Sequence, residues 1–245
     1  MDIITITKDD FLGLSSTIES TRPLRTQPGV RQIIVDSSGG QIRKQVEQIL
    51  EGEENVEYIW SEPSGIAGAF NRGIDASRAQ WVWFLNGGDT FHPGMDCTVF
   101  LSILRNSSAD AVIFQMEGRQ SHTKHPHPPL WALWPPVNSW IPHPAMVLKR
   151  QLFADHGYFD REYRISMDYE MWLRMFSEDV SVDLISIPVV VYDESGSSST
   201  RLKESAREAL KILRSKRGML LNRWLENGRM ILRAVRYYRR VGKSG

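Results

Sequence analysis

Short apolar runs alternate with amphipathic segments along the first half of the chain. Runs of about four to eight residues rich in Ile, Val and Trp are typical of strands buried in a sheet. They occur at residues 2–7, 31–38, 56–63 and 79–85. Between them, apolar residues recur every three or four positions, which predicts helices near 9–21, at 40–52 and at 65–77. Because strands that alternate with helices pair in parallel, the pattern predicts a doubly wound α/β sheet.

The second half has a less regular pattern. Residues 118–144 contain four His, three Trp and seven Pro, a composition typical of an ordered loop that forms a surface. Around this loop, the pattern predicts a helix at 96–106, a strand at 110–116, a strand and short helix over 145–160, a helix at 165–179, and a pair of short strands around Pro188 over 180–194.

The chain is expected to be helical from residue 203 onwards, with breaks at Gly218 and Gly228. Leucines and aromatic residues form stripes along this segment, and arginines occupy much of the remaining surface. This pattern is typical of a basic amphipathic helix that lies on an anionic membrane. Packing on its own domain, or on a second subunit in a homodimer, is the alternative. We therefore divide the chain into a domain at 1–200 and a basic helical tail at 201–245.

Charge is distributed unevenly between these two parts. The whole chain has a net charge of +1, but residues 1–200 contain 16 Lys and Arg against 26 Asp and Glu, whereas residues 201–245 contain 14 against 3. A basic tail favours anionic surfaces, and an acidic body argues against a nucleic-acid partner. We expect no signal peptide and no membrane-spanning run. The single cysteine, Cys97, excludes an intramolecular disulfide and so favours the reducing cytoplasm. Together with the basic tail, this predicts a cytoplasmic protein on the inner face of the cell membrane.

A carboxylate follows the most apolar strand. In "WVWFLNGGDTF" (81–91), the strand ends and two glycines precede Asp89. The carboxyl ends of parallel strands meet at one edge of the sheet, which predicts that Thr5, Asp36, Ser37 and Glu62 share a crevice with Asp89. A divalent cation that also binds a diphosphate would suit Asp89, since Mg²⁺ combines one or two carboxylates with substrate phosphates. An Asp at a strand end is also common as a turn residue or helix cap.

A diphosphate leaving group requires an acceptor and a base. Asp168, in "SMDYE" at the start of a predicted helix, is the candidate base. The same position suits a carboxylate that interacts only with the helix dipole. Spacing alone leaves both roles open.

Five segments in order resemble the inverting family 2 glycosyltransferases of the GT-A fold. They are "ITIT", "IIVDSSGG", "SEPSGIAGAFNRGIDASRAQWVWFLNGGDTF", "HPAMVLKRQLFADHGYFD" and "ISMDYEMWLRMF", within residues 2–200. The resemblance implies a Rossmann-like, mostly parallel sheet flanked by helices. It also implies a nucleotide-sugar-binding half at 1–117 and an acceptor-binding half at 118–200. The donor would be a nucleotide diphosphate sugar, most often a UDP-sugar, and the acceptor a glycan or glycolipid.

The resemblance also implies roles for residues at matching positions. Asp168 would be the general base, and Asp89 would hold Mn²⁺ or Mg²⁺. Nucleotide-sugar contacts would come from Thr5, Asp36, Gly65, Asn71, Arg72, Asn86, Gly87 and Gly88. Further contacts to acceptor or diphosphate would come from His143, Trp140 and Ser197, the last in the segment "DESGSSS". The chain departs from the family pattern in having Asn86 and Gly88 where many members have Asp, and Met167 where Glu is usual.

The resemblance therefore implies metal-dependent, inverting transfer of a hexosyl or N-acetylhexosaminyl group in the synthesis of surface polysaccharide or glycolipid. A nucleotidyltransferase would need a Gly-rich, basic phosphate loop after the first strand, and "TITKDDFLGL" has none. A non-catalytic, membrane-associated sugar-nucleotide binder or scaffold is the other alternative, prompted by the reduced metal motif. It predicts nucleotide binding without transfer.

Overall fold

The computed structural model describes residues 1–125, 143–176, 180–195 and 201–215. The elements of the first half follow the predicted alternation: β1 (Asp2–Thr7), α1 (Phe11–Arg25), β2 (Arg31–Asp36), α2 (Gly40–Leu50), β3 (Val56–Trp60), α3 (Gly65–Ala76) and β4 (Trp81–Phe84). The second half contains β5 (Thr90–Phe91), α4 (Cys97–Asn106), β6 (Ala111–Gly118), β7 (Lys124–His125), η2 (His143–Ala145), β8 (Met146–Lys149), α5 (Gln151–His156), α6 (Met167–Phe176), β9 (Val182–Tyr192) and α8 (Leu202–Ser215).

All described strands belong to one sheet in the order β3-β2-β1-β4-β8-β6-β9-β5, with β7 paired to β6. The first four strands in this order are parallel, as predicted. β8 runs antiparallel to both of its neighbours, so the second half of the sheet is mixed. The chain enters β8 at the edge where β4 ends, because Trp83 pairs with Val147 and Trp81 with Lys149. The α/β class is confirmed, and the departure from parallel pairing brings residue 143 to the carboxyl edge of β4.

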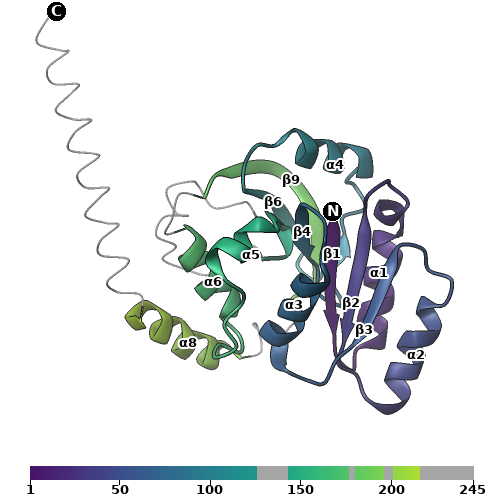
Figure 1. Ribbon diagram of the computed structural model, residues 1–245, viewed down its shortest axis with the longest axis horizontal. Helices are drawn as coiled ribbons and strands as arrows, with labels where there is room; N and C mark the ends of the chain where they lie inside the picture. Colours follow the sequence, from purple (N-terminus) through teal and green to yellow (C-terminus); the bar gives the residue numbers. More distant parts are fainter. Residues whose placement is uncertain (126–142, 177–179, 196–200, 216–245) are drawn as a thin grey trace, which may run out of the picture.

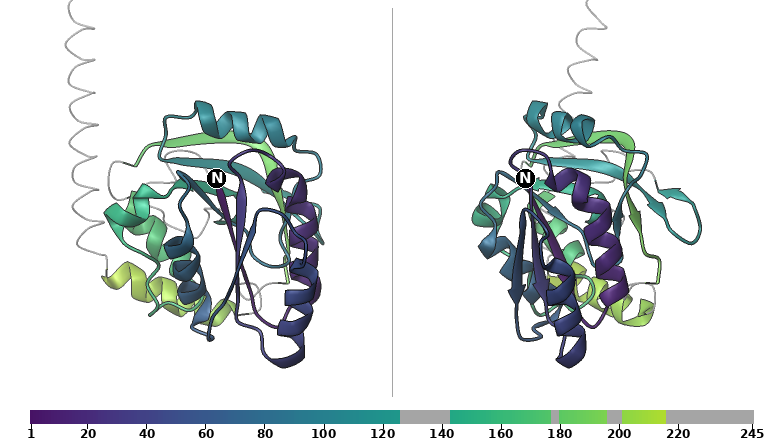
Figure 2. Two further views of the ribbon diagram at one scale, coloured as in Figure 1. Left: turned by 45° about the vertical axis from the view of Figure 1, so that its right-hand side comes forward. Right: turned by 90° about the vertical axis from the view of Figure 1, so that its right-hand side faces the viewer.

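Helices cover both faces of the sheet (Figure 1). α3, α5, α6 and α8 pack on one face, in a core that includes Ile4, Phe70 and Trp172. α1, α2 and α4 cover the opposite face, in cores that contain Ile3 and Ile34. The adjacent residues Ile3 and Ile4 belong to different cores because successive side chains of a strand point to opposite faces. Two turned views show the same layers (Figure 2).

One prediction about strands was wrong. Residues 182–192 form a single strand, β9, instead of two short strands around Pro188. Proline has no N–H to donate to a sheet, and the pairing register between β6 and β9 shifts on either side of the Gln115–Pro188 pair. The irregularity accommodates the proline and lets the strand continue to Tyr192, beside Gly118.

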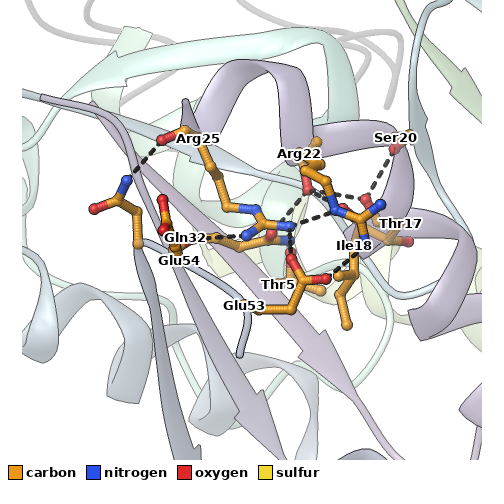
Figure 3. A network of polar contacts seen from close by, with 11 residues as sticks. Thr5, Thr17, Ile18, Ser20, Arg22, Arg25, Gln32, Glu53 and Glu54 are labelled. Carbon is orange, nitrogen blue, oxygen red and sulfur yellow. Dashed lines mark hydrogen bonds and ion pairs between the residues drawn. The ribbon is translucent and has the colours of Figure 1, made fainter. Parts of the chain in front are cut away.

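A buried polar network joins α1 to β1, β2 and the segment before β3 (Figure 3). The Arg25 guanidinium lies 2.7 Å from a Glu53 carboxylate oxygen and donates to the carbonyls of Ile18 and Glu54. Gln32 donates to the Thr5 hydroxyl at 2.9 Å. Because both residues are fully buried, Thr5 has a structural partner between α1 and the sheet.

The beginning of the basic segment packs on the domain. Ile212 of α8 is fully buried in the same core as Met171 and Trp172 of α6. Leu210, in contrast, is 54% exposed on the outer side of α8. α8 is therefore amphipathic, with its apolar side against α6. Among the described residues, no helix is both long and apolar enough to span a membrane.

Candidate functional site

The carboxyl ends of β1, β2 and β4 are held together by main-chain hydrogen bonds. Gly87 donates to the Ile6 carbonyl at 3.0 Å, and Ser37 donates to the Thr7 carbonyl at 3.0 Å. The strands therefore bring Asp36 and the Asn86–Asp89 turn to the same edge, as predicted for parallel strands. At the end of β1, the residue beside this turn is Thr7, because an added Cβ at Gly87 would lie 3.3 Å from the Thr7 hydroxyl oxygen.

Asp89 is buried within the glycine turn, with only 5% of its surface exposed. One carboxylate oxygen accepts from the Asp193 main-chain N–H at 2.9 Å, and the other accepts from the Asn86 side-chain amide at 3.2 Å. Burial raises the pKa of Asp89 to about 6, against the opposing effect of these hydrogen bonds. The carboxylate thus has a fixed orientation at the strand end.

Thr17 of α1 holds the main chain of the same turn. Its hydroxyl lies 2.7 Å from the Asp89 carbonyl and accepts from the Gly88 N–H at 3.0 Å. Gly88 has φ of 102°, a conformation that favours glycine. The turn between β4 and β5 therefore depends on a helix that the sequence places about seventy residues away.

Two residues that sequence reasoning did not single out complete this region. The Arg119 guanidinium, after β6, donates to the Gly88 carbonyl. Asp193, after β9, binds Asp89 through its main chain, and its own carboxylate accepts from Ser195 and from Gln120. Both are brought here by pairing of β9 with β6 and β5. The one sequence signal was the "DESGSSS" segment, which was expected near the diphosphate.

The carboxylate chemistry of this turn fits a hard divalent cation, which prefers oxygen ligands. An atom at the Cβ position of Gly88 would lie 3.5 Å from Asp193 Oδ2 and 4.0 Å from Asp10 Oδ2, so two more carboxylates approach the turn. Within the described residues, no three His, Cys, Asp or Glu side chains converge to hold an ion. Asp89 is the buried carboxylate of this turn, and each of its oxygens accepts a hydrogen bond within the protein.

Asp36 lies at the end of β2 and is fully buried. Its carboxylate accepts from the Ser38 N–H at 2.8 Å and from the Tyr58 hydroxyl at 3.0 Å. Burial, followed by the Asp36 carboxylate, raises the pKa of Tyr58. Asp36 is thus a preorganised acceptor at the strand-end edge.

The other predicted nucleotide-sugar residues occupy different environments. Thr5 lies inside the network described above, two residues before Thr7, the last residue of β1. Asn71 is buried and exchanges two hydrogen bonds with the Phe159 main chain, so its side-chain amide joins α3 to the loop after α5. Arg72 is exposed on α3, and Gly65 begins that helix with φ of 78° and open space around it. The structure groups Asn86, Gly87 and Gly88 with Asp89, and places Thr5 and Asn71 in structural contacts.

Asp168 lies in the first turn of α6 and is partly buried. Burial raises its pKa to about 6, the Tyr169 N–H at 2.7 Å opposes this, and the charge of Glu208 on α8 adds to the rise. A carboxylate of this kind changes protonation near neutral pH, as a general base requires.

His143 connects the strand that precedes Asp89 with the helix that carries Asp168. Its buried ring stacks on Phe84 at 5.4 Å and lies 5.6 Å from the Trp172 ring. Neither ring nitrogen has a hydrogen-bond partner among the described residues. Burial lowers the pKa of His143 to about 4, so its imidazole is neutral at physiological pH. Trp140, Ser197 and the tail beyond residue 215 lie outside the described residues.

Curated relatives and solved structures match most of this chain. Two proteins named as uncharacterized glycosyltransferases, MT1564 and Rv1514c from Mycobacterium tuberculosis strains CDC 1551 and H37Rv, are each 26% identical over 212 residues. Each alignment covers 82% of this chain and 78% of the relative.

The fold is similar to that of S. aureus TarS. One TarS structure gives a TM-score of 0.66 at 14% identity, and the alignment covers 88% of this chain but only 39% of that longer chain. TarS 1-349 in complex with UDP-GlcNAc gives a TM-score of 0.68 at 14% identity, with 90% of this chain and 66% of that chain covered. At this identity, the likeness concerns the fold.

The sequence itself identifies the family. The strand-end turn with Asp89 and strands β1 to β8 lie within one continuous match, and Asp168 directly follows its last residue. The model for glycosyl transferase family 2 matches residues 2–167, well over half of the chain. The chain therefore belongs to glycosyl transferase family 2.

Proposed function

We propose that this glycosyltransferase transfers a sugar from a nucleotide diphosphate sugar, preferentially a UDP-sugar, to an acceptor hydroxyl with inversion at the anomeric carbon. The observation that carries the proposal is the buried Asp89 carboxylate, fixed in a glycine turn at the carboxyl edge of the sheet. Asp36 lies at the end of β2, which is separated from β4 by β1 in the same sheet. Ligands of open α/β sheets bind beyond this edge. The similarly folded TarS 1-349, whose structure was determined in complex with UDP-GlcNAc, supports this choice of donor.

Asp168 is the proposed general base. Its carboxylate takes the proton of the acceptor hydroxyl as the acceptor oxygen forms a bond to the anomeric carbon. The bond between that carbon and the diphosphate oxygen breaks in the same step, and the electron pair leaves with the nucleoside diphosphate. The attack comes from the face opposite the diphosphate, so a single displacement inverts the anomeric configuration and needs no covalent enzyme intermediate.

Asp89 is the proposed protein ligand of a Mn²⁺ or Mg²⁺ ion that also binds the diphosphate. Such an ion supplies charge neutralisation for a departing diphosphate. The chain provides one well-placed carboxylate where many family members provide more, so we expect weak binding of the ion without the nucleotide. Asn86 donates to the Asp89 carboxylate, and an added Cβ would lie against Thr7 at Gly87 and against Asp193 at Gly88.

We further propose an acceptor at an anionic membrane surface, such as a glycolipid or a membrane-bound polysaccharide precursor, glycosylated by a hexosyl or N-acetylhexosaminyl group. The exposed side of α8 carries Lys203, Arg207, Leu210 and Arg214 at helical spacing. Cations around an exposed leucine favour an anionic interface. Sedimentation with phosphatidylglycerol vesicles, compared with phosphatidylcholine vesicles, tests this part of the proposal.

The decisive experiment measures release of nucleoside diphosphate from a panel of sugar nucleotides, with membrane extract as acceptor and with Mg²⁺, Mn²⁺ or EDTA. We expect one donor to be turned over, and both EDTA and Asp89→Ala to abolish the reaction. Asp155→Ala is the matched control, because Asp155 is exposed on α5 and bonds only locally to Gln151 in the contacts described. Nucleotide binding without turnover of any donor would instead support the sugar-nucleotide binder.

A further inference from the structure

Three successive main-chain N–H groups converge on one carboxylate. Glu208 of α8 accepts from Arg164 at 2.9 Å, from Ile165 at 2.9 Å and from Ser166 at 2.8 Å. Burial opposes ionisation of Glu208, but these three donors hold its pKa below the usual range. The carboxylate is therefore charged at neutral pH and forms strong, charge-assisted hydrogen bonds.

The three donors lie immediately before the helix that carries the proposed base. Ser166 is buried, and its carbonyl accepts from the Glu170 N–H at 3.1 Å as α6 begins. The first N–H groups of a helix have no partner within the helix and need one from outside. Glu208 supplies that partner, from another helix, to Ser166, the residue directly before α6, and it also accepts from the two residues that precede Ser166. The entry into α6 thus depends on a residue 42 positions after Ser166.

Further contacts fix α8 against this loop. The Ser166 hydroxyl lies 3.2 Å from the Ser205 hydroxyl, one turn before Glu208. Lys211 binds the Glu162 carboxylate at 3.0 Å and lies over the Tyr163 ring at 5.1 Å. Since Ile212 is fully buried beside α6, the Glu208 side chain reaches the loop from a helix that is itself anchored.

We propose that Glu208 is a positioning residue that fixes the first turn of α6 and so aims the Asp168 carboxylate at the acceptor hydroxyl. This inference rests on the proposed role of Asp168 as the base. With this role, α8 supports the catalytic site in addition to making the proposed contact with a membrane. Glu208 acts on Asp168 through the loop at 164–166 and through its charge, which adds to the rise in the pKa of Asp168. Both effects concern the rate of transfer and leave donor binding at the β1–β4 edge unchanged.

The variants Glu208→Gln and Glu208→Asp test the proposal in the full-length chain. Gln replaces one acceptor oxygen with an NH₂ group that faces main-chain donors, whereas Asp keeps the carboxylate on a shorter side chain. We expect Glu208→Gln to lower kcat about tenfold or more, because small misplacements of a catalytic group are costly. The KM for the donor should stay within about twofold of the wild-type value, and Glu208→Asp should recover part of kcat.

Glu204→Gln is the matched control, since it removes the same charge one turn earlier on the same helix, from an exposed side chain 3.9 Å from Arg201. Thermal unfolding of each variant separates a local effect from loss of the fold. If Asp168→Asn is inactive while Glu208→Gln keeps the kcat of Glu204→Gln, the positioning role is excluded and the proposed function stands. If Asp168→Asn keeps full activity, Asp168 is not the base and the positioning role falls with it, whereas absence of transfer by the wild type from every donor would overturn the proposed function. A rise in donor KM that accounts for the whole loss would also overturn the positioning role.

Discussion

The main-chain N–H of Asp193 donates to a carboxylate oxygen of Asp89 at 2.9 Å, although the two residues are 104 positions apart. The contact follows from strand pairing, because β5 begins directly after Asp89 and its Thr90 pairs with Val191 near the end of β9. The segment after β9 is therefore attached to the strand-end turn. Any change in this attachment should alter the orientation of the Asp89 carboxylate.

Arg119 offers a first test of that attachment. Its guanidinium donates to the Gly88 carbonyl and lies 3.4 Å from the Thr90 hydroxyl, and its charge acts on both Asp89 and Asp193. We expect Arg119→Ala to lower kcat/KM about tenfold or more, because the turn loses a side-chain anchor and a nearby cation. Arg105→Ala, at an exposed position on α4, removes the same charge on the helix that precedes β6 and should leave kcat/KM unchanged. Equal activity of the two variants would contradict this role.

Gly88 and Gly29 form a matched pair for the geometry of the turn. Both glycines have positive φ, 102° and 77°, which side chains disfavour. An added Cβ at Gly88 would lie 3.5 Å from the Asp193 carboxylate, whereas at Gly29 it would meet nothing within 4 Å. Replacement of either by Ala should lower the free energy of unfolding by about 1–2 kcal/mol. Only Gly88→Ala should also reduce donor turnover. If Gly29→Ala lost a similar share of turnover, the loss in Gly88→Ala would be explained by lower stability alone.

The activity should depend on pH through Asp168. Burial raises the pKa of this carboxyl to about 6, and a general base must be ionised to act. We expect log(kcat/KM) to be flat above pH 7 and to fall below pH 6 by about one unit per pH unit through Asp168. The slope should approach about two where Asp89, whose pKa is also about 6, must be ionised as well. The profile should be measured with acceptor present, over a range in which circular dichroism shows an intact fold. A profile in which kcat/KM begins to fall only near pH 4 would indicate that Asp168 is an ordinary, solvated carboxyl.

The same carboxyl should lower stability at neutral pH. Its folded-state pKa of about 6 exceeds the ordinary value of 3.8, so the protonated form is favoured in the folded protein. This contribution to stability is complete below pH 3.8 and is lost as pH rises through 6. Asp168→Asn should therefore raise the free energy of unfolding at pH 7.5 by about 1–3 kcal/mol, with no gain at pH 3.5. Urea unfolding of the wild type and the variant at both pH values measures this. If Asp168→Asn changed the free energy of unfolding equally at pH 7.5 and pH 3.5, the raised pKa of Asp168 would be contradicted.

Much of the fold could be predicted because its determinants are local. Apolar runs and helical spacing placed β1 to β4 and the intervening helices, and the rule for parallel strands brought Asp36 and Asp89 to one edge. Thr5 was expected at that edge, but its hydroxyl is bonded to Gln32 within the network below it. The strand pattern alone does not show which threonine of "ITIT" lies at the end of the strand.

The missing parts of the site depend on contacts between distant segments. Arg119 and Glu208 carry no local signal of function, and Asp193 carries only that of its "DESGSSS" segment, because each acts where separate strands or helices meet. The register shift at Pro188 also depends on a contact between distant segments. A proline considered alone predicts a break in the strand, and only its pairing with β6 shows how β9 continues. The hypothesis that residues 201–245 form a separate tail also changes for its first helix, because α8 packs in the core through Ile212.

Donor turnover by three proteins measured side by side tests the central claim most directly: the wild type, Asp168→Asn and the exposed control Asp155→Asn. With the donor that the panel identifies and membrane extract as acceptor, we predict that Asp155→Asn keeps wild-type kcat. Asp168→Asn should lose at least about a hundredfold in kcat, the usual contribution of a general base, while still binding the nucleotide. Equal kcat for all three proteins would contradict the assignment of Asp168 as the base.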